Sequence, residues 1–399
     1  MRARFAARNP PARSRPATRL RSTLAVAIAA ALAVAACNGE QPETPGPTLP
    51  TALGELEGEL NLIAWDGYVE RAWVTPFEEE TGCIVNPTLA GSADEMVSLL
   101  ASGEHDGLSA SGYITNRLID EGAVAPINLT LVPNYGGIFE GLRGRPHNTT
   151  DGFTYGVPHG RGANVLMWRT DIVAPAPESW SAVFDPDSPY AGRVTAYDAP
   201  IAIADAAVYL MTAQPELQIT NPYALDDRQF SAAVDLLRAQ REIVGRHWSL
   251  YTDAMHAFTD GDAVLGTSWQ VIRNLLVADG VPVEVTMPVE GATGWSDTWM
   301  LASGADHPNC MYAWMDHILS PDVNAAAAVY FGEAPVSAAA CERAEQLSPG
   351  HCATYHAADE EYFSKVYYWS TPRRECGDER GAVCADYAEW VQAWAELRG

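Results

Sequence analysis

Two short stretches combine aromatic rings with a carboxylate, an arrangement that suits the binding of a cation. Residues 65–68 (Trp-Asp-Gly-Tyr) follow the apolar run at residues 60–64, and residues 295–297 read Trp-Ser-Asp. The face of a Trp or Tyr ring attracts an alkylammonium group, and a carboxylate gives it a charge-assisted hydrogen bond. Methylene groups between two amines would pack on the same rings.

Motifs typical of hydrolases are absent from the sequence. Neither G-x-S-x-G nor H-E-x-x-H occurs, and the histidines show no spacing typical of metal ligands. The sequence therefore favours a binding protein without cofactor or metal over an enzyme.

The first 57 residues predict export and anchoring. Residues 1–22 carry seven arginines and no acid, an apolar run follows, and the run ends in Val-Ala-Ala-Cys at Cys37. This order predicts a lipoprotein signal peptide over residues 1–37, with lipid attached to Cys37. An ordinary secretion signal followed by an unmodified cysteine is the alternative. Residues 38–57 contain four prolines and predict an extended tether.

The charge balance is strongly acidic, with 51 Asp and Glu against 25 Lys and Arg. Seven of the basic residues would leave with the signal peptide. Such a surface argues against nucleic acid as a partner and is compatible with a cationic ligand or with solubility alone. We expect an extracytoplasmic protein held to the membrane only by its lipid, in a periplasm where the envelope has an outer membrane.

Six cysteines remain besides Cys37, and they allow fifteen disulfide pairings. Short spacings suit local disulfides at Cys341–Cys352 and Cys376–Cys384, which would leave Cys83 for Cys310. Zinc binding is the alternative, although no C-x-x-C pair occurs.

Strand and helix patterns alternate along the chain, which predicts an α/β fold with mostly parallel sheets covered by helices. Extended segments at residues 155–168 and 295–303 interrupt this alternation. Two such crossings between two α/β lobes would form a hinge. Expected strands cover residues 60–65, 83–89, 194–197 and 264–267, and expected helices cover residues 69–81, 92–101, 115–121, 203–212, 230–244 and 387–397.

Residues 58–345 resemble the bacterial periplasmic-binding-protein superfamily, and within it the spermidine/putrescine-binding proteins of ABC importers. The resemblance rests on the order and spacing of WDGYVE…FEEETGC, DGLSASGY, YGVPHGRGAN, FTDGDAVLGTSW and EGATGWSDTW. It implies a two-lobed type II fold with a cleft. Lobe 1 would comprise residues 58–157 and 299–345, lobe 2 residues 158–298, and residues 346–399 would form a C-terminal extension packed on the lobes.

The resemblance also implies which side chains bind the ligand. Asp66 stands where the family has a small polar residue and is included as a candidate. The positions carried over from the family are Trp65, Tyr68, Ser111, Tyr113, Trp269, Trp295 and Asp297.

Three positions depart from the family pattern. A family glutamate in the second lobe is here Ile201, with Asp198 as the local acid. Where the family has Gly-Tyr, this chain has Gly332-Glu333. Where the family has an aromatic residue at the first crossing, this chain has Arg161. Asp198 and Glu333 would keep the site anionic, whereas Arg161 would receive a ligand carboxylate or form a structural ion pair.

These observations predict a monomeric receptor that binds a small cationic solute, a polyamine, and delivers it to the transmembrane subunits of an ABC permease by hinge closure. The alternative is a binding protein of the same fold for a zwitterionic amine or a sugar, since aromatic walls also suit a sugar ring.

Overall fold

The computed structural model describes residues 47–398. The predicted signal peptide, the lipid-attachment residue Cys37 and residues 38–46 of the tether lie outside the described residues. Within residues 47–398, no helix combines the length and the apolar content that crossing a membrane requires.

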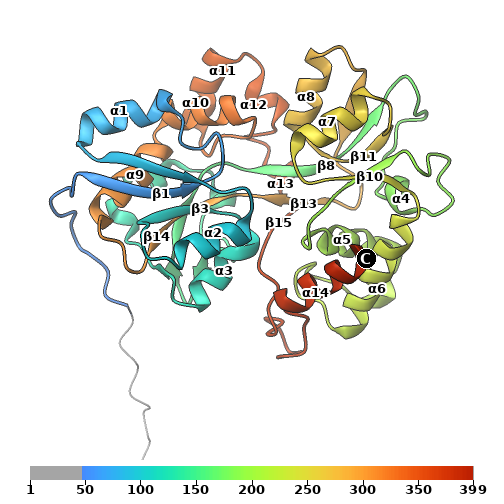
Figure 1. Cartoon of the computed structure of the whole chain (residues 1–399), viewed down its shortest axis with the longest axis horizontal. Helices are drawn as coiled ribbons and strands as arrows, with labels where there is room; N and C mark the ends of the chain where they lie inside the picture. The colour runs from blue at the N-terminus through green and yellow to red at the C-terminus, as the bar shows by residue number, and fades with distance from the viewer. Residues whose placement is uncertain (1–46, 399) are drawn as a thin grey trace, which may run out of the picture. The chain divides into compact units, whose positions relative to one another are not determined.

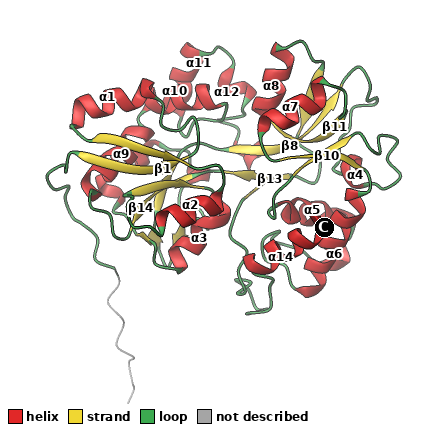
Figure 2. Cartoon of the chain, viewed as in Figure 1, coloured by secondary structure: helices red, strands yellow, loops and turns green. Residues whose placement is uncertain are grey.

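Residues 47–398 are built around two β-sheets, each with helices on both faces (Figures 1 and 2). The first sheet has the order β2-β1-β3-β14-β4, with β7 also paired to β14. Its strands are β1 Glu59–Ala64, β2 Ile84–Leu89, β3 Gly107–Ala110, β4 Val124–Ala125, β7 Gly156–Pro158 and β14 Thr298–Ala302. The helices of this half are α1 Arg71–Thr81, α2 Ala93–Leu100, α3 Gly112–Asp120, α9 Pro308–Leu319, α10 Pro321–Phe331 and α11 Ala338–Leu347.

The second sheet has the order β10-β9-β11-β8-β13-β15, with β12 also paired to β8. Its strands are β8 Gly162–Arg169, β9 Val194–Tyr197, β10 Val244–Trp248, β11 Leu265–Trp269, β12 Val283–Thr286, β13 Ala292–Trp295 and β15 Val366–Tyr368. Its helices are α4 Ser181–Phe184, α5 Ala202–Ala213, α6 Asp227–Arg241, α7 Tyr251–Thr259, α8 Gln270–Ala278 and α14 Tyr387–Arg398. Short elements are β5 Thr149–Thr150, β6 Phe153–Thr154, α12 His351–Thr354, α13 Glu360–Phe363 and the 3₁₀ segments Leu129–Leu131, Pro133–Gly137, Glu140–Leu142 and Pro215–Leu217.

The sheets are mixed rather than mostly parallel. β1 runs parallel to β2 and β3, and β9 runs parallel to β10 and β11. β14 and β8, however, run antiparallel to the neighbours with which they pair. These are the strands by which the chain enters each sheet after a crossing, so their direction is set by the crossing and not by a helical βαβ connection.

The chain crosses between the sheets at residues 159–161, at residues 296–297, and a third time between α11 of the first half and β15 of the second sheet. Hydrogen bonds join the first two crossings: the His159 N–H donates to the Asp297 carbonyl at 2.8 Å, and the Ser296 hydroxyl donates to the Gly160 carbonyl at 2.9 Å. These first two crossings fall inside the extended segments that the sequence predicts.

Local sequence explains the first elements. Leu60, Leu62 and Ile63 are fully buried because helices cover both faces of β1. In the following helix α1, Trp73 and Phe77 are buried one turn apart, and Gly82 ends the helix in the left-handed conformation at φ 74°.

Three disulfides join Cys83 to Cys310, Cys341 to Cys352 and Cys376 to Cys384, which is the pairing that the cysteine spacing favoured. The first links the start of β2 to α9, so it ties an early and a late segment of the first half together.

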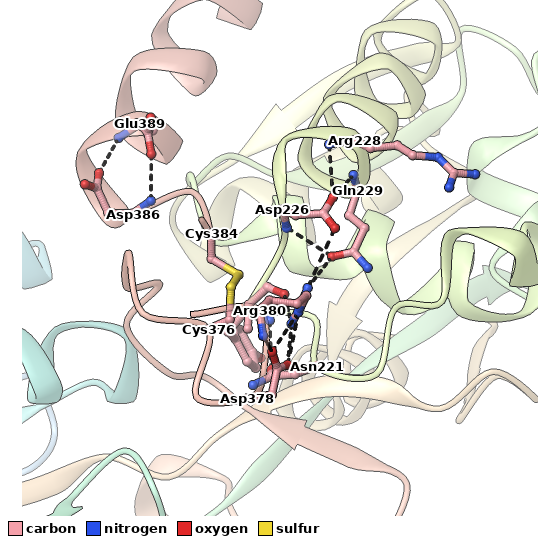
Figure 3. The surroundings of a disulfide bond; sticks show 12 residues. Asn221, Asp226, Arg228, Gln229, Cys376, Asp378, Arg380, Cys384, Asp386 and Glu389 are labelled. Carbon is pink, nitrogen blue, oxygen red and sulfur yellow. Dashed lines mark hydrogen bonds and ion pairs between the residues drawn. A yellow bond between two sulfur atoms is a disulfide. The ribbon is translucent and has the colours of Figure 1, made fainter. Parts of the chain in front are cut away.

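The C-terminal segment is an integral part of the second half. β15 adds a parallel strand to the second sheet, and α14 buries Trp390 and Trp394 in the second core. Figure 3 shows the loop closed by Cys376 and Cys384: Arg380 donates from this loop to Gln229 at the start of α6, at 2.8 Å. The segment predicted as an extension packed on the lobes therefore contributes a strand to the second sheet and a helix to the second core.

Candidate ligand-binding site

Asp297 is the centre of the candidate site. It lies in the second crossing, and only 6% of its surface is exposed. The Ser111 hydroxyl donates to Oδ1 at 2.8 Å, and the Tyr68 hydroxyl donates to Oδ2 at 3.0 Å. Burial raises the pKa of Asp297 to about 6, while these two hydrogen bonds and the nearby Trp65 indole act in the opposite direction.

The ends of two neighbouring strands supply these partners. Trp65 directly follows β1, and Ser111 follows β3 as the residue before α3. A turn closed by the Tyr68 N–H and the Trp65 carbonyl carries Tyr68 back over the sheet. Gly67 has φ +87° in this turn, a conformation that side-chain-bearing residues rarely adopt. The apolar strand therefore ends in Trp-Asp-Gly-Tyr because the turn directs Tyr68 toward Asp297, whereas Asp66 is exposed.

Aromatic rings surround this carboxylate on the side of the first sheet. Tyr68 stacks on the His159 imidazole at 3.7 Å between ring centroids and meets Phe331 edge-on at 4.8 Å. Phe331 in turn meets the Trp295 ring edge-on at 5.9 Å. Trp295 is 7% exposed, and its indole N–H has no hydrogen-bond partner among the described residues.

A second aromatic group comes from the other half of the molecule. Tyr197 ends β9, and Trp369 follows β15; their rings are parallel at 6.2 Å. Trp369 also meets Tyr113 of α3 edge-on at 5.6 Å. Burial is the main cause that raises the pKa values of Tyr113 and Tyr197, the latter to about 12, and the charge of Asp297 adds to both. The charge of Asp297 therefore raises the pKa of a tyrosine in each half of the molecule.

Behind this second group lies a chain of buried polar side chains. The Trp269 indole donates to the Asn164 amide oxygen at 2.8 Å, the Asn164 amide donates to the Thr293 hydroxyl at 2.6 Å, and Thr293 donates to Asp205. Burial raises the pKa of Asp205 to about 7. The chain fixes the orientation of the Trp269 ring, which packs edge-on against Trp248 at 4.9 Å.

Two of the predicted residues are engaged elsewhere. Arg161 is fully buried and donates to the Ala357 carbonyl at 2.7 Å and to Glu360 at 2.8 Å; its guanidinium lies 3.7 Å from the Phe363 ring centroid. The structure therefore shows the structural ion pair, one of the two roles that the sequence left open for Arg161.

Asp198 likewise has partners within its own half. It accepts a hydrogen bond from the Trp394 indole at 3.1 Å and pairs with Arg398 at 3.4 Å, both from α14. Sequence reasoning did not foresee these partners because they come from the C-terminal helix.

The structure thus brings Tyr68, Ser111 and Asp297 into direct contact, with Trp65, Tyr113 and Trp295 around them. Sequence reasoning missed four residues. Tyr197 had a usable signal, since it ends a buried strand as Trp65 does; the others, which had none in the local sequence, are Trp369, His159 and Asp205. In residues 47–398, no group of three or more His, Cys, Asp or Glu side chains has a geometry that would hold a metal ion.

Comparison with known proteins places the chain in a family. The chain belongs to the bacterial extracellular solute-binding proteins, whose family model matches residues 72–349. The spermidine/putrescine-binding periplasmic protein of Escherichia coli K12 is 23% identical over 279 residues, covering 69% of this chain and 76% of that protein.

Solved structures show the same fold. The spermidine/putrescine ABC transporter substrate-binding protein of Streptococcus pneumoniae superposes with a TM-score of 0.67 at 16% identity, covering 85% of this chain and 97% of that one. A periplasmic-binding protein of A. tumefaciens B6, solved with glucopine, gives 0.64 at 17% identity over 86% and 100% of the two chains. The protein therefore has the two-lobed type II periplasmic-binding-protein fold.

The family defines the general role. Its members are extracellular or periplasmic proteins that bind a small solute and deliver it to an ABC permease, and they are not enzymes. The family resemblance and the fold class predicted from the sequence are confirmed.

Proposed function

We propose that the protein is a receptor for an alkylammonium solute of the polyamine type, such as putrescine or spermidine. The observation that carries the proposal is the Asp297 carboxylate, buried among aromatic rings and held by two hydroxyl groups. The names of relatives such as the Escherichia coli protein support the same ligand class.

Physical chemistry supports this match. A cation over the face of Trp or Tyr gains about 0.5–2 kcal/mol, and a hydrogen bond to a charged group contributes about 1.5–3 kcal/mol. Rings that exclude water strengthen the attraction between the ammonium and Asp297. The methylene groups of a polyamine would pack on Trp295 and on Tyr113, which are both apolar over most of their surface.

A zwitterionic ligand would need a cationic partner for its carboxylate. Arg161, the candidate for that role, is already paired with Glu360 and stacked on Phe363. Asp297, the charged group that the Tyr68 and Ser111 hydroxyls hold, is an acid, which favours an ammonium group as its ligand.

We further propose how the receptor operates. Residues 58–157 and 299–345 form lobe 1, residues 158–298 form lobe 2, and the crossings at residues 159–161 and 296–297 act as the hinge. Ligand that contacts both lobes would favour the closed state. The signal peptide and Cys37 would anchor the protein, as a monomer, to the outer face of the membrane by lipid.

Calorimetric titration of residues 38–399, which retain every described residue, tests the ligand class. The panel would contain putrescine, spermidine, γ-aminobutyrate, arginine and a few sugars, with Asp297→Asn as the matched variant. We expect tight binding of di- or triamines that Asp297→Asn weakens by about tenfold to a hundredfold. Binding of only a zwitterion or a sugar would refute the proposal.

A further inference from the structure

Glu333 is a buried carboxylate at a position that its local backbone enforces. Helix α10 ends at Phe331, and Gly332 follows with φ +87°. A Cβ at Gly332 would lie 2.4 Å from the Val271 side chain, so the turn is packed tightly against the second half. The turn directs Glu333 into the interior, where it is 1% exposed.

The Glu333 carboxylate has no hydrogen-bond partner among the described residues; both of its oxygens are buried and unsatisfied. Its nearest basic atom is His159 Nε2, 3.5 Å from Oε1. That imidazole is neutral, because its Nδ1 accepts a hydrogen bond from the Trp299 indole at 2.9 Å and burial lowers its pKa to about 3.

No arginine or lysine in residues 47–398 lies within ion-pair distance of Glu333. Arg161 is paired with Glu360 instead. A buried carboxylate without a counter-charge is costly, so native proteins rarely keep one without a partner or a role. Burial and the charge of Asp297 raise the pKa of Glu333 well above its usual range, so the carboxyl group is held neutral until a cation beside it favours the ionised form.

The surroundings of Glu333 suit an alkylammonium group. The carboxylate borders a hollow that is also lined by the rings of Trp269, Trp295, Tyr355 and Phe363 and by Arg161, whose charge is paired with Glu360. Trp295 stands two residues before Asp297, and Tyr68 feels the charges of both Asp297 and Glu333. Both carboxyl groups therefore act on the Tyr68 hydroxyl, and Trp295 lines the hollow beside Glu333.

We propose that Glu333 binds the second ammonium group of a diamine whose first ammonium group is bound by Asp297. This inference rests on the proposed function and makes it more specific: the ligand carries two separated positive charges, and its methylene chain packs on Trp295. The ammonium group supplies both the charge and the N–H donors that the Glu333 oxygens lack.

Two amines that differ in one charge test the inference. Putrescine and n-butylamine have the same carbon chain, but only putrescine carries a second ammonium group. Dissociation constants of both would be measured by calorimetry for the wild type, Glu333→Gln, Glu333→Asp and Asp297→Asn in the chain from residue 38 onward. Glu284→Gln, which removes an exposed carboxylate paired with Arg273, is the matched control.

We expect the wild type to prefer putrescine over n-butylamine by about tenfold to a hundredfold, from one charge-assisted contact. Glu333→Gln should lose most of that preference, while Glu333→Asp and Glu284→Gln keep it. Asp297→Asn should weaken both amines. Thermal unfolding would show that Glu333→Gln, which conserves size, leaves the fold intact.

An unchanged preference in a folded Glu333→Gln would overturn the role of Glu333 while leaving the amine receptor in place. If the wild type bound neither amine nor any polyamine, the proposed function itself would fall, and this inference with it.

Discussion

At the scale of single residues, the site depends on the balance that Asp297 keeps between charge and burial. Burial disfavours the ionised form, and hydrogen bonds from Ser111 and Tyr68 favour it. A pKa of about 6 results, close enough to neutrality for the group to change its charge in a mildly acidic medium.

Amine binding should therefore depend on pH. Only the ionised carboxylate attracts an ammonium group, and at about pH 5 about a tenth of a group with a pKa of about 6 is ionised. We expect the dissociation constant for putrescine to rise by about tenfold between about pH 7.5 and about pH 5. Calorimetric titration across this range measures it, and a flat profile would contradict the role of Asp297.

Loss of folded protein at low pH should not account for this loss of affinity. A carboxyl group whose pKa is higher in the folded than in the unfolded chain binds its proton more tightly when folded. The contribution of Asp297 to the free energy of unfolding of the ligand-free protein therefore rises as the pH falls from about 6 to about 4. Thermal unfolding at each pH is the control.

Tyr68→Phe tests the hydroxyl group that supports the charge. Without it, Asp297 keeps only the hydrogen bond from Ser111, so its pKa should rise and the pH profile of binding should move to higher pH. We expect affinity at neutral pH to fall by roughly fivefold to tenfold, the value of one hydrogen bond. Tyr312→Phe, whose hydroxyl accepts from Asn128 away from the site, is the control; equal effects of both variants would refute the assignment.

At the scale of elements, strand ends and crossings position the site, and disulfides hold the outer helices. Trp65 and Ser111 come from adjacent strand ends, Asp297 comes from a crossing, and none of them lies on a cysteine-bearing helix. Cys341 of α11 is bonded to Cys352 of α12, and neither helix carries Trp65, Ser111 or Asp297. Stability and binding should therefore be separable at this disulfide.

Cys341→Ser combined with Cys352→Ser should lower the free energy of unfolding by about 2–3 kcal/mol, because the opened loop gains freedom mainly in the unfolded chain. Differential scanning calorimetry should show a lower melting temperature, while the affinity for putrescine changes less than threefold, about 0.6 kcal/mol. A large loss of affinity with unchanged melting would show that the disulfide shapes the site instead.

At the scale of the whole described molecule, the C-terminal segment connects the two halves. β15 and α14 belong to the second half, yet Arg373 between them pairs with Asp120 of α3 at 2.7 Å and donates to the Asn116 carbonyl. Residues after 349 lie beyond the family model's match. This segment follows the chain's third crossing, and its Arg373 adds an ion pair between the two halves.

Arg373→Ala should weaken the contact between the two halves, because it removes the ion pair with Asp120. The ion pair is partly exposed, so its contribution is at most about 1 kcal/mol, and we expect putrescine affinity to fall by up to about fivefold. Small-angle scattering without ligand should show a larger radius of gyration. Arg374→Ala, whose partners Asp386 and Glu389 lie in the same C-terminal segment, is the matched control. Identical scattering and affinity for both variants would contradict the link.

The sequence by itself determined the fold class, most of the elements around the first sheet, the first two crossings and the disulfide pairing. These follow from local periodicity, from short cysteine spacings and from a resemblance that spans most of the chain. The family resemblance also singled out Tyr68, Ser111 and Asp297, and the strand-end position of Tyr68 agrees with where open α/β sheets bind ligands.

Only the tertiary structure decided which charges are free. Arg161 meets Glu360, and Asp198 meets Arg398, across 199 and 200 positions of sequence. No local pattern specifies such partners, because an ion pair depends on where two distant segments pack and not on either segment alone. For the same reason, the sequence did not predict that Trp369 packs beside Tyr113. It also did not predict that the Glu333 carboxyl group is buried without a hydrogen-bond partner among the described residues.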